Sequence, residues 1–177
     1  MSYIHISLIR PLKRFNLRYL RRVLENAFGM KTNVVKSDLD ISFAYDPSRG
    51  QYHASALLLR LSENPPADAS RVLSITDADL FVPIFEYLFG EAQFNGLGAV
   101  ISSYMLHNER YGLPADRVLL SERLSKEAIH ELGHTFGLTH CFSPYCVMNP
   151  STVVEQIDAK SMEFCAECRH KIEGKSA

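Results

Sequence analysis

Hydrophobic residues in the first hundred positions follow two kinds of spacing: short apolar runs, and apolar positions three or four residues apart. The runs predict strands, the last two of them buried inside a sheet, at residues 3–9, 32–36, 71–76 and 99–105. The wider spacing predicts helices over residues 15–28 and 52–61, and Gly29 follows the first helix where a left-handed cap is common. Residues 41–45 predict a third short strand or an arm. Strands that alternate with helices indicate an α/β layer built on a twisted, mostly parallel sheet.

A longer amphipathic pattern follows the last of these strands and predicts another helix, for which Ser121 is the expected N-cap. One side of this helix is an apolar stripe, formed by Leu124, Ala128, Leu132 and Phe136. His130 and His134 lie roughly 160° away from the stripe at 100° per residue. We therefore expect the stripe to pack on the sheet and the two histidines to face a cleft.

This helix carries the motif His130-Glu131-x-x-His134-x-x-Gly137-x-x-His140. Two histidines four residues apart are about 40° apart around a helix and about 6 Å apart along it, so both can reach one ion. Gly137 can adopt a positive φ, end the helix and bring His140 to the same ion. Three imidazoles and one open position are typical of catalytic zinc. Glu131 is too close to both histidines to join the ligands easily, and it is placed to act as general base on a metal-bound water.

Alternative interpretations of the polar residues remain open from the sequence. A helix with two surface histidines would explain neither Gly137 nor His140. A glutamate as third metal ligand, with Glu155 as the candidate, is disfavoured by the same two residues. Asp77 and Asp79 could bind a cation, although two carboxylates in a turn are more often solvated or capping groups.

The composition suits a single globular domain over residues 1–177. The chain is 46% hydrophobic and has a net charge of −1, which gives no reason to expect a polyanion or an acidic membrane surface as partner. No apolar run approaches the length of about 18 residues that a membrane span needs. Arg10, Lys13 and Arg14 interrupt the N-terminal segment before a signal-peptide core could form. We expect a monomeric cytoplasmic protein that binds neither nucleic acid nor membrane.

All four cysteines lie near the C-terminus, as Cys141-x4-Cys146 and Cys165-x2-Cys168. Two short-spaced pairs fit a tetrahedral structural zinc site that clamps a short C-terminal segment. Two disulfides are an alternative that a reducing compartment disfavours. A redox Cys-x-x-Cys would be expected near a βαβ pattern, and a nucleic-acid zinc ribbon would be expected to carry more basic neighbours.

The stretch from His130 to Cys168 resembles the signature of the archaemetzincins, a metzincin-clan group of zinc metallopeptidases, because it joins the zinc motif to the four cysteines. The resemblance implies a metzincin-like zincin fold that hydrolyses peptide or protein substrates. It implies two zinc ions, a catalytic one on the three histidines with Glu131 as general base, and a structural one on the four cysteines. It also implies that Met148 forms the Met-turn, an apolar floor below the catalytic zinc.

The same resemblance divides the domain into an N-terminal subdomain, residues 1–137, with the sheet and the active-site helix, and a C-terminal subdomain, residues 138–177. Residues 99–105 would form an inner strand. Residues 87–93 would form an antiparallel edge strand that pairs with extended substrate. Pro150 occupies the position at which some metzincins place a further tyrosine ligand, so that ligand is absent here.

Three functional classes follow from these patterns, and we favour the zinc-dependent peptidase. The second class is a catalytically silent zinc-binding protein whose cleft is blocked by the aromatic segment 81–94, in which Gly90 indicates a bend. The third is a zinc-ribbon interaction module. Tyr145 and Tyr104 are the candidates for a second oxyanion donor.

Overall fold

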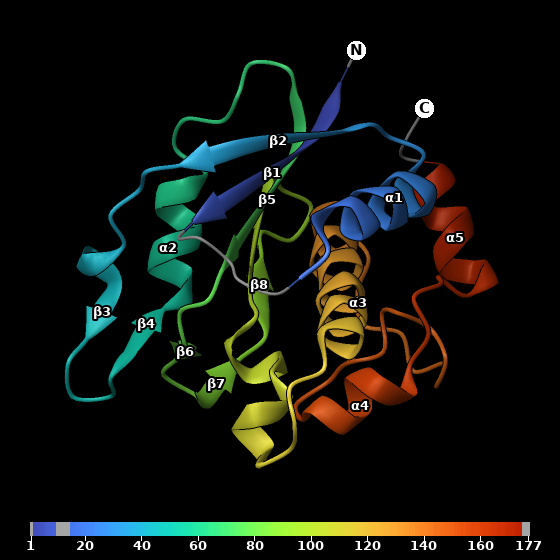
Figure 1. The fold of residues 1–177 in the computed structure, drawn as a ribbon. Helices are drawn as coiled ribbons and strands as arrows, with labels where there is room; N and C mark the ends of the chain where they lie inside the picture. The colour runs from blue at the N-terminus through green and yellow to red at the C-terminus, as the bar shows by residue number, and fades with distance from the viewer. Residues whose placement is uncertain (1, 10–14, 175–177) are drawn as a thin grey trace.

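A five-stranded sheet forms the middle layer of the molecule (Figure 1). The computed structural model describes residues 2–9 and 15–174, so Arg10, Lys13 and Arg14 lie outside the described residues. The strand order is β2 (Thr32–Ser37), β1 (Tyr3–Ile9), β5 (Ala69–Thr76), β9 (Gly98–Ser102) and β8 (Gly90–Ala92). Neighbouring strands are parallel except for β8, which pairs antiparallel with β9. The predicted mostly parallel sheet with an antiparallel edge strand is confirmed. The edge strand is shorter than the expected residues 87–93, because Phe85–Leu88 form a strand of a second sheet.

Helices cover both faces of this sheet. Successive side chains of a strand point to opposite faces, and the strands have apolar side chains on both. Helices α1 (Leu17–Phe28) and α3 (Arg117–Thr135) lie over one face, and α2 (Ala54–Leu61) lies over the other (Figure 1). Ile4 and Ile6 of β1 join the core under α1 and α3, whereas Val100 of β9 joins Leu57 in the core under α2. Gly29 ends α1 with φ of 65°, as expected. Within the described residues, no helix is long and apolar enough to cross a bilayer.

A second, four-stranded sheet differs from the sequence prediction. Its order is β3 (Tyr45–Asp46), β4 (Gln51–His53), β6 (Leu80–Val82) and β7 (Phe85–Leu88). The predicted strand or arm at residues 41–45 is mostly a 3-10 turn, Ser42–Ala44. Tyr52 and His53 pair with β6, so the helix expected over residues 52–61 begins only at Ala54. These strands are too short for an alternating pattern to reveal them, and their pairing is set by tertiary contacts.

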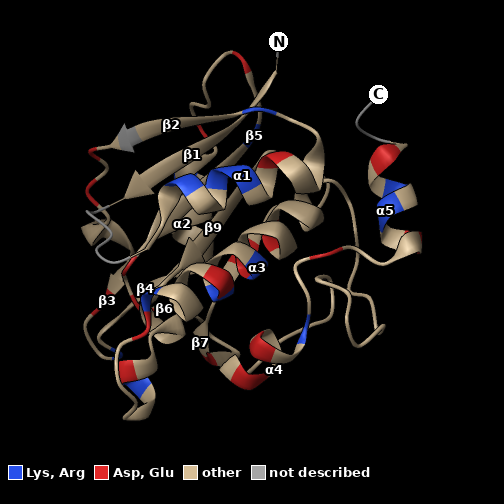
Figure 2. Cartoon of the chain, turned by 45° about the vertical axis from the view of Figure 1, so that its right-hand side comes forward, with Lys and Arg blue, Asp and Glu red and all other residues tan. Residues whose placement is uncertain are grey.

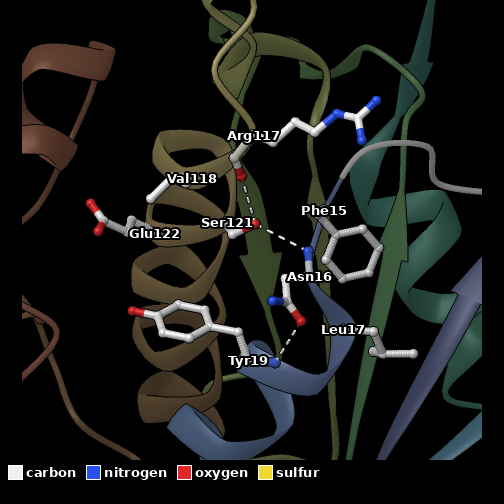
Figure 3. Close-up of a pocket in the computed structure, with 8 residues that line it drawn as sticks. All are labelled: Phe15, Asn16, Leu17, Tyr19, Arg117, Val118, Ser121 and Glu122. Atoms are coloured by element: carbon white, nitrogen blue, oxygen red, sulfur yellow. Dashed lines mark hydrogen bonds between the residues drawn. The ribbon is translucent and has the colours of Figure 1, made fainter.

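The start of α3 also corrects a prediction, because the N-cap is Asp116 and not Ser121. Asp116 Oδ1 accepts the backbone N–H groups of Val118 and Leu119 at 2.9 Å each. Ser121 lies one turn further on and joins two helices, donating to the carbonyl of Arg117 at 2.8 Å and accepting from the backbone N–H of Asn16 at 3.0 Å (Figure 3). A hollow of about 580 Å³ borders this junction.

The chain after α3 packs back against that helix and against α1. Two 3-10 turns, Tyr104–Leu106 and Asn108–Tyr111, precede α3, and α4 (Val154–Ala159) and α5 (Ala166–Glu173) follow it. Arg123 of α3 forms a two-pronged ion pair with Asp158 of α4 at 2.7 and 2.6 Å. Figure 2 shows basic and acidic positions along α3 and acidic positions on α4. Arg169 of α5 donates to the carbonyl of Ala27 at the end of α1. The C-terminal segment is thereby fixed to both helices.

Candidate active site

Helix α3 presents His130 and His134, and the chain returns to bring His140 beside them. Gly137 has φ of 78° and donates its N–H to the carbonyl of His134 at 2.8 Å, which turns the chain after the helix. The Nε2 atoms of His130 and His134 are 3.1 Å apart. The ring of His140 lies 5.3 and 5.0 Å from theirs, and one nitrogen of each ring lies within 4.8 Å of the other two. The three side chains can therefore hold one metal ion.

Backbone carbonyls orient the two helical histidines. His130 Nδ1 lies 2.9 Å from the carbonyl oxygen of Val147, and His134 Nδ1 lies 2.7 Å from that of Leu138. A carbonyl oxygen only accepts, so each Nδ1 is assigned the proton and each Nε2 keeps a free lone pair. Both rings thus turn Nε2, with its free lone pair, toward the space between them.

Burial lowers the pKa of all three imidazoles, and that of His130 lies well below its ordinary value. The positive charge of Lys160 lowers these pKa values further. The histidines are therefore neutral at physiological pH, which is the form in which imidazole binds metals.

Glu131 is buried between the histidine cluster and the edge strand β8. Burial, and then the negative charge of Glu127, raise its pKa well above the ordinary value. Gly90 of β8 lies directly against it, because a Cβ atom added to Gly90 would stand 2.8 Å from Glu131 Cγ and 2.9 Å from the carbonyl oxygen of Val100. The absence of a side chain at Gly90 lets the edge strand approach the carboxylate.

Gly90→Ala is expected to lower the peptide hydrolysis that the sequence resemblance implies by about 10- to 100-fold, because the added methyl group must displace Glu131 or the edge strand, and small misplacements at a reacting centre are costly. The metal content should not change. Steady-state hydrolysis and metal analysis on the same preparation measure both. Gly174→Ala is the matched control, since its Cβ would meet nothing closer than the carbonyl oxygen of His170 at 3.6 Å. Unchanged hydrolysis by Gly90→Ala would contradict the tight contact with Glu131.

A cleft of about 530 Å³ opens over these residues. One wall is the segment from Phe85 to Ala92, the other runs from Pro150 to Val153, and Glu127, Glu131 and the three histidines line the space between them. The size is within the range of about 300–1,000 Å³ typical of ligand pockets. The aromatic segment that could have blocked the cleft instead forms its wall.

Met148 is fully buried and packs against the helix that carries His130 and His134. Its sulfur fits against Gly133 of α3, where an added Cβ would stand 2.5 Å from the sulfur and 3.1 Å from the terminal methyl carbon. A glycine at this position therefore allows the methionine to lie directly against the helix, at the residue just before His134 and three residues after His130.

The four cysteine sulfurs form a second cluster, all within 4.8 Å of one another. All four cysteines are free, and the sulfurs of Cys141 and Cys165 are 3.7 Å apart, well beyond the length of about 2.05 Å for a disulfide bond. The backbone N–H of Cys168 lowers the pKa of Cys165 to about 7, and burial raises that of Cys146. Cys141 directly follows His140, so the two clusters adjoin along the chain.

Several other candidates from the sequence lie outside the cleft. Tyr145 is 74% exposed, and Tyr104 stacks under the guanidinium of Arg110 at 3.9 Å. Glu155 is exposed on α4, and neither Asp77 nor Asp79 belongs to a metal-ligand cluster of the described residues. Burial raises the pKa of Asp79.

Sequence reasoning missed two residues that line the cleft, Tyr87 and Glu127, and a third, Lys160, that contacts Glu127 from behind the cleft surface. Tyr87 donates its hydroxyl to the carbonyl of Thr152 at 3.2 Å, across the two walls. Glu127 lies one turn before Glu131 on α3, where its spacing could have revealed it. Lys160 lies far along the chain, and no local pattern connects it to the cleft.

The comparisons with known proteins agree with this arrangement. The sequence pattern of peptidase family M54 matches residues 21–174. The archaemetzincin of Methanocaldococcus jannaschii is 37% identical over 157 residues, which cover 89% of this chain and 85% of that protein. The chain belongs to the archaemetzincins, peptidase family M54.

Solved structures extend the likeness of this archaemetzincin to the fold. The archaemetzincin of Methanopyrus kandleri is 32% identical and aligns with a TM-score of 0.86 over 98% of this chain and 94% of that one. A zinc-dependent peptidase of Methanocorpusculum labreanum is 30% identical, with a TM-score of 0.84 over 96% and 99%. The metzincin-like fold and the family resemblance are confirmed, and the protein is a zinc metallopeptidase that acts on peptide or protein substrates.

Proposed function

We propose that His130, His134 and His140 bind the catalytic zinc of this peptidase, with Glu131 as general base. The observation that carries the proposal is the convergence of three neutral imidazoles on one point of an open cleft, with a buried carboxylate beside them. Three nitrogen ligands leave the fourth position of a tetrahedral zinc for water or substrate. Met148 is proposed as the Met-turn residue, because its side chain packs against Gly133 of the same helix.

Zinc, when bound here, would lower the pKa of a coordinated water toward about 7 and polarise the scissile carbonyl. Glu131 is placed to accept a proton from the attacking water and would return it to the leaving amine. Burial raises the pKa of Glu131, but a divalent cation beside the carboxylate acts in the opposite direction. The outer side of β8, the last strand of its sheet, is proposed to pair with extended substrate through backbone hydrogen bonds.

The four cysteines are proposed to bind a second, structural zinc. Their sulfurs converge without forming disulfides, and they connect the loop after His140 to the start of α5. One chain supplies both clusters and both walls of the cleft, so we expect the monomer to be active. Residues 1–137 and 138–177 are interpreted as two subdomains of one domain, each of which contributes one wall.

Metal analysis of protein purified without chelator is expected to give about two zinc ions per chain. The ion at the histidines should leave first when a chelator is added, because its site opens into the cleft. His134→Ala should reduce the content to about one ion per chain. One zinc ion together with two disulfides would refute the four-cysteine site, and a full zinc content in His134→Ala would refute the histidine site.

A further inference from the structure

The proposed chemistry does not use a buried ion pair beside the cleft, of which one member, Glu127, lines the cleft. Lys160 follows α4, and its Nζ lies 2.9 Å from Oε1 of Glu127 on α3. The two side chains are only 1% and 4% exposed. Burying two charges is unfavourable unless they are paired, and well-packed apolar side chains often stabilise a fold at least as well. Stability alone is therefore a weak explanation for this pair.

The contacts of Lys160 point to another role. Its Nζ also donates to the backbone carbonyl of Asn149 at 3.2 Å. Asn149 directly follows Met148, and Glu127 lies one turn before Glu131 on α3. One ammonium group therefore joins the active-site helix to the turn that carries the buried methionine.

Three consecutive residues of this turn each contact the active-site region. The carbonyl of Val147 accepts a hydrogen bond from His130, the sulfur of Met148 lies against Gly133, and the carbonyl of Asn149 accepts from Lys160. The contact of Val147 is a hydrogen bond between neutral groups, and that of Met148 is van der Waals packing. The hydrogen bond of Asn149 has the buried ammonium group of Lys160 as donor, and a charged donor makes a hydrogen bond stronger.

We infer that Lys160 is a positioning residue for catalysis: it holds residues 147–149 against α3, so that His130 and the floor of the histidine cluster keep their geometry. The inference rests on the proposed histidine zinc site. Because it concerns the geometry of a metal site, it predicts a change in zinc affinity that is measurable without any substrate.

The apolar pair Lys160→Met/Glu127→Leu removes both charges and is expected to fold with a melting temperature near that of the wild type. It leaves the carbonyl of Asn149 without its charged donor. The affinity of the histidine site for zinc should fall by about tenfold or more, which is the scale of losing a supporting contact around a metal site. The kcat should fall with it, whereas KM should change little. Chelator competition and the absorption spectrum of the cobalt-substituted protein report the geometry of the site.

Lys126→Met is the matched control. Lys126 is, like Lys160, a buried lysine, but it lies on α3, and its Nζ donates to the carbonyls of Ile157 and Asp158 and not to residues 147–149. It should lower the melting temperature and leave zinc affinity and kcat unchanged. If the apolar pair fails to fold, the single variant Lys160→Met takes its place and is compared with Lys126→Met below both melting temperatures.

Two outcomes overturn the inference. The first is that the folded apolar pair, or Lys160→Met in its place, has the same zinc affinity and kcat as the wild type. The second is that Lys126→Met loses as much zinc affinity as the variant that removes Lys160. The zinc content of the wild type, measured on the same preparation, tests the histidine site separately. A wild type without zinc at the histidines would refute that assignment and the role of Lys160 with it, whereas a normal wild type and a normal variant refute the role of Lys160 alone.

Discussion

Glu131→Gln is expected to lower peptide hydrolysis by about 100-fold or more while the zinc content stays at the wild-type value. Glutamine has nearly the same size as glutamate but cannot take a proton from water. Because Glu131 is buried against β8 and carries no metal in the proposed site, the amide should fit the same space without moving the histidines. Zinc content and hydrolysis are measured on the same zinc-saturated sample.

A peptide-library digest with mass-spectrometric detection gives the assay its breadth, since any cleavage present in the wild type should be missing in the variant. His134→Ala is the matched contrast, because it should lose activity together with the zinc ion at the histidines. Equal hydrolysis by wild type and Glu131→Gln across the library would exclude Glu131 as the general base and remove the proposed mechanism.

The parts of this molecule that the sequence predicts are those in which one local rule decides the structure. The apolar stripe at Leu124, Ala128, Leu132 and Phe136 is buried at 2% exposure or less, because a period of 3.6 residues leaves one side of a long helix facing the sheet. The motif around His130 could be interpreted in the same way, since the spacing of a helix and one glycine turn fix the approach of three side chains. Strand β9 is an inner strand, as expected, but it ends at Ser102, because the end of the predicted stretch 99–105 enters the 3-10 turn Tyr104–Leu106.

Other features depend on partners that are distant in the sequence. β3, β4, β6 and β7 contain two to four residues each, too few for a pattern, and they exist because they pair with one another. Ser121 has the chemistry of an N-cap, but the helix begins earlier because Asp116 satisfies its first N–H groups. Lys160 meets Glu127 only because α4 packs on α3. Such contacts are not visible in any local window of the sequence.

Cys165→Ser is expected to lower the zinc content by about one ion per chain and to reduce the free energy of unfolding by several kcal/mol. A structural zinc contributes about 10–16 kcal/mol in small zinc-finger peptides, and the loss here should be smaller because the core around the main sheet does not depend on the metal. Cys165 lies at the start of α5, and Cys168 and Ile172 of that helix are buried in the main core. Chemical denaturation with zinc analysis measures both quantities.

The same variant should also weaken zinc binding at the histidines, because the two clusters are joined through the backbone. Cys141 follows His140, and its N–H donates to the carbonyl of Met148 at 2.9 Å. Releasing the thiolates therefore loosens the segment that carries one histidine and the segment that carries the buried methionine. Lys171→Ala, a change on the exposed side of α5, is the control and should match the wild type in stability and zinc content. If Cys165→Ser has the same melting temperature and zinc content as the wild type, the four cysteines do not form a structural zinc site.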